Sequence, residues 1–192
     1  MTVTKRDQQA EERRRQLLDT ALALFAQRGF ENTTIKDLAE ATGVAQGLVY
    51  HYFRSKDELL FAILEERGFL PALRRLLTVS PDRPAAEVLD EVAHGFSDFL
   101  TERGLMLRIV MREAQTNPRV ALMREGMIEG GVELLSSYLA ARIRAGELRP
   151  HDPRITARAF FSTLVVLHLT RTPTDDFLPA FVDLLLHGVA AS

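Results

Sequence analysis

The residues with the clearest chemical potential in this sequence lie between Thr33 and Lys56, in the segment TTIKDLAEATGVAQGLVYHYFRSK. Its caps and apolar spacing predict two short helices, over 35–41 and 46–52. Gly43 stands between them, where a tight turn needs a residue without a side chain. Two short helices joined by such a turn are typical of a helix-turn-helix.

The apolar side chains of this segment predict which faces of the two helices meet. Ile35 and Leu38 give the first helix an apolar face, and Val44 follows the turn as an inward plug. Val49 and Phe53 are four residues apart, so they share one face of the second helix and can pack back onto the first. The opposite face of the second helix is therefore expected to be exposed.

That exposed face carries Gln46, Gly47, Tyr50 and His51, an unusual set for a short solvent-facing helix. A glutamine can make two hydrogen bonds to an adenine edge in the major groove of DNA. A glycine allows the backbone to approach its partner closely. The pattern predicts a surface that reads DNA bases.

Other polar residues around this face are suited to contacts with phosphate. The hydroxyl groups of Tyr50 and Tyr52 can donate to phosphate oxygens. Lys56 adds a cation in the first turn of the next helix, and Thr34 stands at the start of the first helix of the pair. Free N–H groups at helix starts also attract phosphate. We therefore expect these four residues to hold the DNA backbone.

The composition limits the other functions that the chain could have. With 192 residues, 46% hydrophobic, the chain can form a real core, and its formal charge of −2 excludes a protein coated with basic residues. The absence of cysteine excludes disulfides, thiolate nucleophiles and cysteine-ligated metals. The polar start is unlike a secretory signal, and no stretch is long and apolar enough for a membrane span, so we expect a soluble, cytoplasmic protein without membrane contact.

Motifs for catalysis and cofactors are also missing from the sequence. The five histidines show no HExxH or other tight ligand spacing, and there is no GxSxG, GxGxxG or phosphate-binding loop. We therefore predict no metal, no cofactor and no enzymatic activity.

Apolar residues recur at helical spacing along almost the whole chain, as in Leu18, Ala21, Leu22 and Phe25, which predicts an all-α fold. Capping signals and glycines divide the chain into about nine helices. The expected ranges are 7–28, 35–41, 46–52, 56–78, 84–102, 105–115, 118–145, 153–171 and 175–190. We expect a helix-turn-helix DNA-binding domain over 1–55, with the motif itself at 34–53, and a second helical domain over 56–192, which the family resemblance given next implies to be a ligand-binding and dimerisation domain.

The N-terminal segment resembles the DNA-binding domain of the TetR family of one-component repressors. The resemblance rests on the run Arg13, Arg14, Arg15, on LFAQRGFENTTIKDLAEATGV and on YHYFRSKDELL, and it covers roughly the first 60 to 70 residues. It implies base reading at positions 46, 47, 48 and 51. One departure is Ala45, where the family often has a capping residue. The full set of DNA contacts that it implies is Thr34, Gln46, Gly47, Leu48, Tyr50, His51, Tyr52 and Lys56.

The last two predicted helices are apolar on nearly all sides, which favours a buried partner surface. The resemblance implies that these helices pair with their copies in a homodimer. A two-fold dimer would place two recognition helices about 34–36 Å apart and would bind a palindromic operator. The expected interface residues are Phe161, Val165, Leu169, Phe181 and Leu185.

The middle helices combine large apolar side chains with glycines at 126, 130 and 131, a pattern that fits either an ordinary core or a pocket. The resemblance favours a pocket for a small, largely apolar effector. Its expected lining is Phe96, Phe99, Met106, Ile109, Met123 and Met127.

Together these features predict a homodimeric repressor that releases operator DNA when its C-terminal domain binds a small molecule. The alternative is a small-molecule-binding or protein-interaction module in which the N-terminal helices are merely structural. An enzyme is the third possibility, and no group of residues in the sequence supports it.

Overall fold

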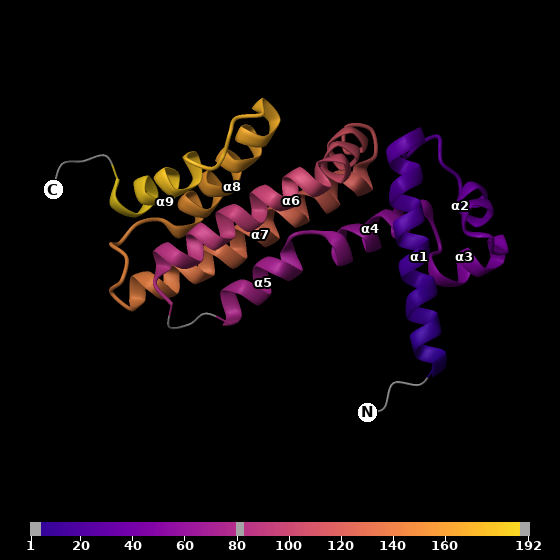
Figure 1. Cartoon of the computed structure of the whole chain (residues 1–192), viewed down its shortest axis with the longest axis horizontal. Helices are drawn as coiled ribbons and strands as arrows, with labels where there is room; N and C mark the ends of the chain where they lie inside the picture. Colours follow the sequence, from indigo (N-terminus) through magenta and orange to yellow (C-terminus); the bar gives the residue numbers. More distant parts are fainter. Residues whose placement is uncertain (1–4, 80–82, 189–192) are drawn as a thin grey trace. The chain divides into compact units, whose positions relative to one another are not determined.

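The computed structural model describes residues 5–79 and 83–188, and these residues fold into helices throughout (Figure 1). The predicted all-α fold is confirmed. The described helices are α1 (Lys5–Arg28), α2 (Ile35–Thr42), α3 (Gln46–Tyr52), α4 (Lys56–Arg67), α5 (Leu70–Val79), α6 (Ala85–Glu113), α7 (Pro118–Arg144), α8 (Pro153–Thr170) and α9 (Phe177–His187).

The structure differs from the predicted helices at two places. The single helix expected over 56–78 is broken at Gly68, whose N–H closes α4 by donating to the carbonyl of Leu64 (2.9 Å). A Cβ atom at Gly68 would lie 2.2 Å from that carbonyl oxygen, so only glycine fits this end of α4. Conversely, the helices expected over 84–102 and 105–115 are one continuous helix, α6, in which Gly104 is a buried interior residue.

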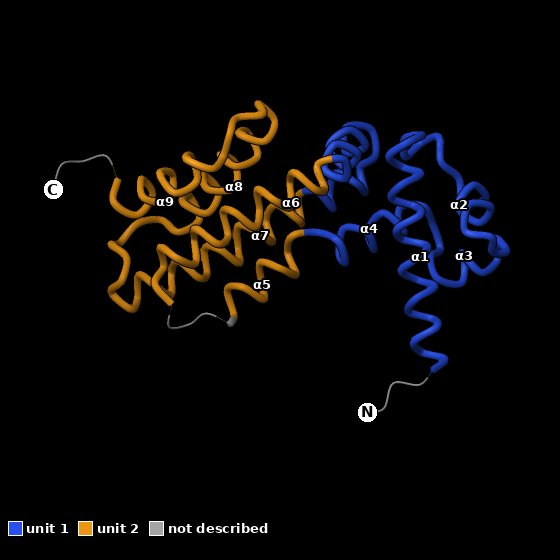
Figure 2. The backbone as a smooth tube through the Cα atoms, viewed as in Figure 1, with its two compact units in different colours: residues 1–68, 105–124 blue, residues 69–104, 125–192 orange. Residues whose placement is uncertain are grey.

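The chain forms two compact units, and neither is a continuous stretch of sequence (Figure 2). The first unit contains the described residues of 1–68 together with 105–124. The second contains the described residues of 69–104 and 125–192. Helix α6 therefore begins in the second unit and ends in the first, and α7 begins in the first unit and ends in the second.

The core of the first unit forms where α2 and α4 pack against α1, and α3 packs against α2. Phe25 of α1 meets the ring of Phe30 edge-on, with 5.0 Å between ring centroids. The largest fully buried side chains of this unit come from α1, α2, α4 and the connecting segments: Leu17, Leu18, Phe25, Phe30, Leu38, Phe53, Leu59, Leu60 and Ile63.

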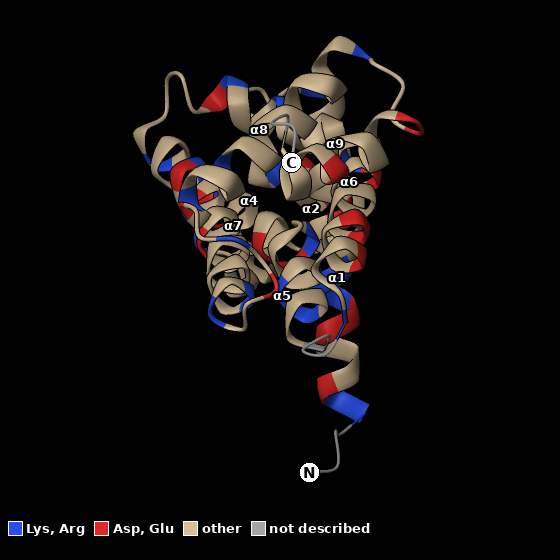
Figure 3. Cartoon of the chain, turned by 90° about the vertical axis from the view of Figure 1, so that its left-hand side faces the viewer, with Lys and Arg blue, Asp and Glu red and all other residues tan. Residues whose placement is uncertain are grey.

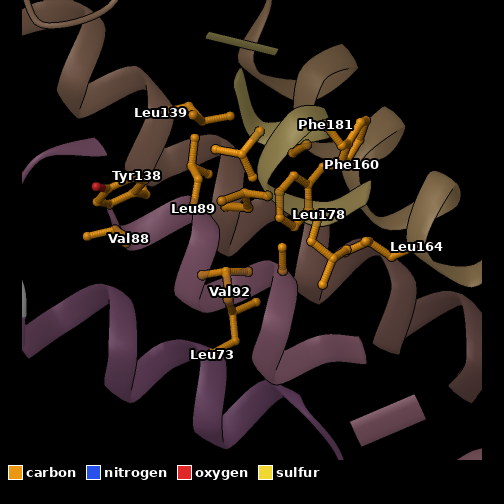
Figure 4. Close-up of a cluster of buried hydrophobic side chains, with 14 of the residues drawn as sticks. Leu73, Val88, Leu89, Val92, Tyr138, Leu139, Phe160, Leu164, Leu178 and Phe181 are labelled. Atoms are coloured by element: carbon orange, nitrogen blue, oxygen red, sulfur yellow. The ribbon is translucent and has the colours of Figure 1, made fainter. Parts of the chain in front are cut away.

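The core of the second unit brings together side chains from α5 to α9 (Figure 4). Burial of apolar surface on this scale is the main force that holds such helices together. The residues labelled in the figure are Leu73, Val88, Leu89, Val92, Tyr138, Leu139, Phe160, Leu164, Leu178 and Phe181.

Two predicted helix starts, each a capping residue followed by a proline, are confirmed in the C-terminal half. Asp152 caps α8 by accepting from the N–H groups of Arg154 (2.9 Å) and Ile155 (3.2 Å). Asn117 caps α7 in the same way, with a bond of 3.0 Å from the N–H of Arg119.

Of the helices in the described residues, none combines the length and the apolar character that crossing a bilayer requires.

Candidate nucleic-acid interface

The start of α2 is fixed by a capping box, as the sequence predicts. The hydroxyl oxygen of Thr34 accepts from the N–H of Asp37 (3.1 Å), and the Asp37 carboxylate accepts from the N–H of Thr34 (2.8 Å). These bonds from Thr34 lower the pKa of Asp37, and Arg28 at 3.3 Å adds to the effect. Thr34 is exposed, but its hydroxyl group already serves the cap.

The turn between α2 and α3 is set by Gly43, which has a φ of +67°. This left-handed conformation is strained for residues with a side chain, so the glycine determines where α2 ends. The N–H of Val44, the next residue, donates to the carbonyl of Ala39 (3.0 Å) and completes the turn before α3. The two helices thereby meet as the predicted helix-turn-helix.

Helix α3 has one face in the core and the other in solvent. Val49 on α3 and Phe53 directly after it are almost fully buried, with 0% and 1% of their surfaces exposed. Leu48 and Tyr50 on the helix are 37% and 48% exposed. Two large side chains therefore stand on the solvent side of α3, where a partner can contact them.

The remaining predicted base-reading residues, Gln46, Gly47 and His51, are exposed as well. A Cβ atom at Gly47 would meet no other atom within 4 Å, so the surface above it is open. Tyr52 is half-buried, and its ring meets the ring of His51 edge-on at 5.5 Å. Ala45 precedes α3 in extended conformation without a side-chain cap, which matches the departure seen in the sequence.

Lys56 has a structural role that the sequence does not reveal. Its ammonium group donates to the carbonyl oxygens of Phe30 (2.6 Å) and Glu31 (3.2 Å) and lies 4.4 Å from the centre of the Phe30 ring. An ammonium group has three donors, so two of them are engaged inside the protein. A contact with phosphate would have to use the third.

The arginine run near the start of α1 is also largely engaged within the protein. Arg14 lies over the ring of Phe53, 5.2 Å from its centre, and pairs with Glu66. Arg15 pairs with Glu12 at 3.2 Å. Basic and acidic segments are interspersed along the helices (Figure 3).

The connection between α6 and α7 and the first turn of α7 belong to the first unit, and their side chains contact the first turn of α4. The side-chain amide of Asn117 donates to the carboxylate of Asp57 (3.2 Å), and Arg119 lies 3.7 Å from the same carboxylate. Sequence reasoning missed these contacts, because nothing local links residue 57 with residues 60 positions away. The first turn of α4 therefore contacts both the α1–α2 connection, through Lys56, and the start of α7, through Asp57.

Glu113, the last residue of α6, is only 4% exposed. Burial raises the pKa of its carboxyl group, and the neighbouring carboxyl group of Glu31 raises it further, while Arg112 and Lys56 act in the opposite direction. A buried carboxylate beside another carboxylate is costly when both are charged. Glu113 is thus the acidic group in this unit whose charge is least favourable.

Replacing Glu113 with glutamine is expected to raise the melting temperature at pH 7. Because the folded-state pKa is raised, the favourable contribution of Glu113 is complete below its unfolded pKa of about 4.3 and is lost as pH rises through the folded value. The variant should therefore match the native protein near pH 4 and exceed it at neutral pH in a thermal melt. Glu102→Gln, at an exposed position of the same helix, is the control. A less stable Glu113→Gln protein at pH 7 would contradict this expectation.

The residues predicted to line an effector pocket are divided between the two units. Phe96 and Phe99 stack at 6.1 Å in the second unit, where Phe69 and Phe161 lie 4.9 and 5.0 Å from Phe96. Met127 is half-buried in the same unit. The three others belong to the first unit, two of them buried and one half-buried: Met106, Ile109 and Met123.

The residues predicted for the dimer interface differ widely in exposure. Phe181 is only 8% exposed and packs against Phe160, and Phe161 is half-buried against Phe96. Val165 and Leu185 are half-buried, whereas Leu169 is 65% exposed. Other exposed apolar side chains of α8 and α9 are Ile155, Val166, Phe177 and Leu184.

Comparisons with known proteins cover both halves of the chain. Residues 17–63 match the family described as bacterial regulatory proteins, tetR family, and residues 87–171 match the AefR-like transcriptional repressor, C-terminal domain. The uncharacterized HTH-type transcriptional regulator YfiR of Bacillus subtilis is 30% identical over 155 residues, which are 79% of this chain and 75% of that protein.

Other relatives match over shorter stretches or in fold alone. The HTH-type transcriptional repressor KstR2 of Rhodococcus jostii is 49% identical over 61 residues, which are 32% of this chain and 29% of that protein. The matched stretch thus spans about three-tenths of KstR2. The structure of FadR from Bacillus subtilis in complex with stearoyl-CoA superposes with a TM-score of 0.72 at 23% identity, covering 92% of this chain and 99% of that one.

Proposed function

The chain belongs to the tetR family of bacterial regulatory proteins, and we propose that it represses transcription by binding a palindromic operator as a homodimer. The observation that carries this proposal is the outer face of α3. It exposes Gln46, Leu48 and Tyr50 while the inner face buries Val49. A helix placed in this way can enter the major groove with its exposed side chains toward the bases.

We assign base reading to Gln46, Gly47, Leu48 and His51. Gln46 can recognise an adenine, Leu48 can contact a thymine methyl group, and His51 can donate to a base acceptor. The open surface over Gly47 allows the helix backbone to approach the groove. These four positions lie on one exposed face in the first turn and a half of α3.

We assign phosphate contacts to Thr34, Tyr50, Tyr52 and Lys56. Exposure supports Tyr50, because 48% of its surface is open to solvent. Lys56 would act with one remaining donor, and its main effect would be to hold the α1–α2 connection in place for the other contacts. Because so few cations are available for phosphate contacts, the helix-turn-helix unit of a single protomer should bind DNA weakly.

A second copy of the chain would supply the missing affinity. The exposed apolar side chains of α8 and α9 include Val166, Leu169 and Leu184. Helices with such faces bury them by packing against equivalent helices of a two-fold partner. We therefore place the dimer interface on the exposed face of these helices, with Phe161 and Phe181 supporting it from inside.

We further propose that a small effector, binding to the second unit, controls operator binding in the cytoplasm. Structures of two similar regulators were determined with small molecules, stearoyl-CoA in Bacillus subtilis FadR and choline in a regulator of Saccharomonospora viridis. The aromatic cluster around Phe96 and Phe99 supports an apolar site in this chain. An effector acts only if its affinity differs between the DNA-binding and released forms.

The assignment of the reading face can be tested with DNA selected from a random duplex library by the native protein. We expect a palindromic consensus, and Gln46→Ala should weaken its binding by about tenfold and relax the preference for adenine at one position per half-site. Tyr50→Phe should weaken binding more evenly across sequences. Gln115→Ala, an exposed glutamine of the same unit outside α2 and α3, serves as the control.

The salt dependence of binding distinguishes a DNA regulator from a protein-interaction module. Phosphate contacts release counterions, so the logarithm of the affinity should fall linearly with the logarithm of the salt concentration. Absence of any selected sequence, or native affinity in both Gln46→Ala and Tyr50→Phe, would overturn the proposal.

A further inference from the structure

The connection between α3 and α4 carries an exposed arginine, Arg54, just beyond the end of α3. Phe53, which lies between α3 and Arg54, is extended and only 1% exposed. Successive side chains of an extended segment point to opposite sides. Because the side chain of Phe53 points into the core, that of Arg54 points into solvent.

The backbone of Arg54 is held by hydrogen bonds around it. Its N–H donates to the carboxylate of Glu58 (2.7 Å). Ser55, the next residue, caps α4 by accepting from the N–H of Glu58 (3.0 Å), and the N–H of Phe53 closes α3 by donating to the carbonyl of Val49 (2.9 Å). The position of Arg54 relative to the exposed face of α3 is therefore fixed by the connection itself.

Arg54 differs from the neighbouring cations in having no partner for its side chain. Between residues 28 and 67, all of which the structure describes, it is the only Lys or Arg whose side chain makes no hydrogen bond or ion pair within the protein. A guanidinium group has five N–H donors and keeps its charge at any physiological pH. The other cations of this range all have partners: Arg28 with Asp37, Lys36 with Glu40, Lys56 with two carbonyl groups and Arg67 with Asp19.

The acidic side chains closest to Arg54 in the sequence are engaged elsewhere. The carboxylate of Asp57 accepts from the amide of Asn117 (3.2 Å) and lies 3.7 Å from Arg119. The carboxylate of Glu58 accepts from the backbone N–H of Arg54 and makes no ion pair with its guanidinium group. The charge of Arg54 is therefore available to a partner outside the chain.

The position of Arg54 along α3 suits a phosphate better than a base. A recognition helix contacts base edges with its N-terminal residues. An α-helix rises about 1.5 Å per residue, so the end of α3 at Tyr52 lies about 9 Å from Gln46 along the axis. The major groove is about 8.5 Å deep and about 12 Å wide. When Gln46 is at the base edges, Arg54 therefore lies at the rim of the groove, where the phosphates are.

We propose that Arg54 is the principal phosphate contact of each protomer, and that it binds the DNA backbone beside the C-terminal end of α3. Guanidinium groups bind phosphate through paired, charge-assisted hydrogen bonds, whereas Lys56 has a single donor left for this purpose. Arg54 is not among the DNA contacts that the family resemblance implies. The inference rests on the proposed function, because it assigns a further contact in the same complex with DNA.

The salt dependence of binding to the selected operator tests this contact. Each phosphate contact contributes about 0.9 to the slope of log affinity against log salt concentration, so Arg54→Gln should reduce the slope by about 0.9 per protomer. The variant should also bind about tenfold more weakly, by a similar factor for the operator and for unrelated duplexes. Arg54→Lys, which keeps the charge, should retain most of the native slope. Arg108→Gln, at an exposed arginine of α6 in the same unit, is the control and should bind as the native protein does.

A thermal melt of the free protein separates a contact with DNA from a structural role. Arg54→Gln should melt as the native protein does, because its guanidinium group has no partner in the chain. Lys56→Gln should melt at a lower temperature, because it loses bonds to two carbonyl groups. A lowered melting temperature in Arg54→Gln that accounts for its weaker binding would contradict the proposed contact.

The remaining outcomes distinguish this inference from the proposed function. A selected operator that Arg54→Gln binds with the native salt slope would overturn the Arg54 contact and leave the DNA-binding function intact. Loss of preference at one base position in Arg54→Gln would show base reading and would also overturn the phosphate contact. Absence of any selected operator would overturn the proposed function and the Arg54 contact together.

Discussion

Replacing Phe53 with alanine is expected to abolish operator binding by loosening α3 from the first unit. Phe53 is 1% exposed, closes α3 and lies beneath the guanidinium group of Arg14. Truncation of a fully buried phenylalanine costs about 3–5 kcal/mol. A loss of this size is a large fraction of the total stability of about 5–15 kcal/mol that single domains have.

The measurement for Phe53→Ala is a thermal melt together with binding to the selected operator. The melting temperature should fall sharply, because the core of the first unit loses a fully buried ring. Phe53→Leu, which retains most of the apolar volume, should lose much less stability and retain specific binding. A native melting profile with native operator affinity in Phe53→Ala would refute the placement of this side chain.

The pair of substitutions Val166→Arg and Leu169→Arg is expected to convert the proposed dimer into monomers. These side chains are 56% and 65% exposed and lie three residues apart on α8, so charges there should leave the protomer folded. A charge buried in an apolar interface is strongly unfavourable. Loss of the second head should weaken operator binding by about a hundredfold or more.

Sedimentation velocity measures the oligomeric state of this double variant, and circular dichroism reports whether its helices remain. Leu122→Arg is a matched control, since Leu122 is 69% exposed on α7 and lies outside α8 and α9. That control should sediment as the native protein does. If the double variant still sediments as a dimer and binds the operator normally, the interface lies elsewhere.

The features that the sequence predicted correctly depend on neighbouring residues. The capping box of Thr34 and Asp37 and the turn at Gly43 each involve residues within five positions of one another. The caps at Asn117 and Asp152 are equally local. Helical periodicity and capping are properties of short segments, so composition and spacing are sufficient to find them.

The errors arose where a glycine had to be interpreted without its surroundings. Gly68 ends α4 because its position leaves no room for a side chain beside Leu64. Gly104 lies in the middle of a 29-residue helix that continues through it. The sequence shows a glycine at both positions, and only the backbone geometry separates them: a Cβ atom at Gly68 would clash with the carbonyl of Leu64, whereas α6 continues through Gly104.

Contacts between distant residues explain the rest of what the sequence concealed. Lys56 carries a charge suited to phosphate, yet its ammonium group bonds to carbonyls 25 and 26 residues earlier. Phe161 is apolar enough for an interface, yet its ring faces Phe96 within its own unit. Residue type indicates what a side chain can bind, and the fold determines which partner is within reach.

The discontinuous first unit has a consequence for how the protein is made. A ribosome delivers the helix-turn-helix first, but the segment 105–124, which packs on α4 through Asn117, emerges only after α5 and most of α6. Domains often fold as units during synthesis, beginning at the N-terminus. Here the contacts of Asp57 with Asn117 and Arg119 can form only after this late segment has emerged, so slowing translation before residue 124 should delay completion of the first unit.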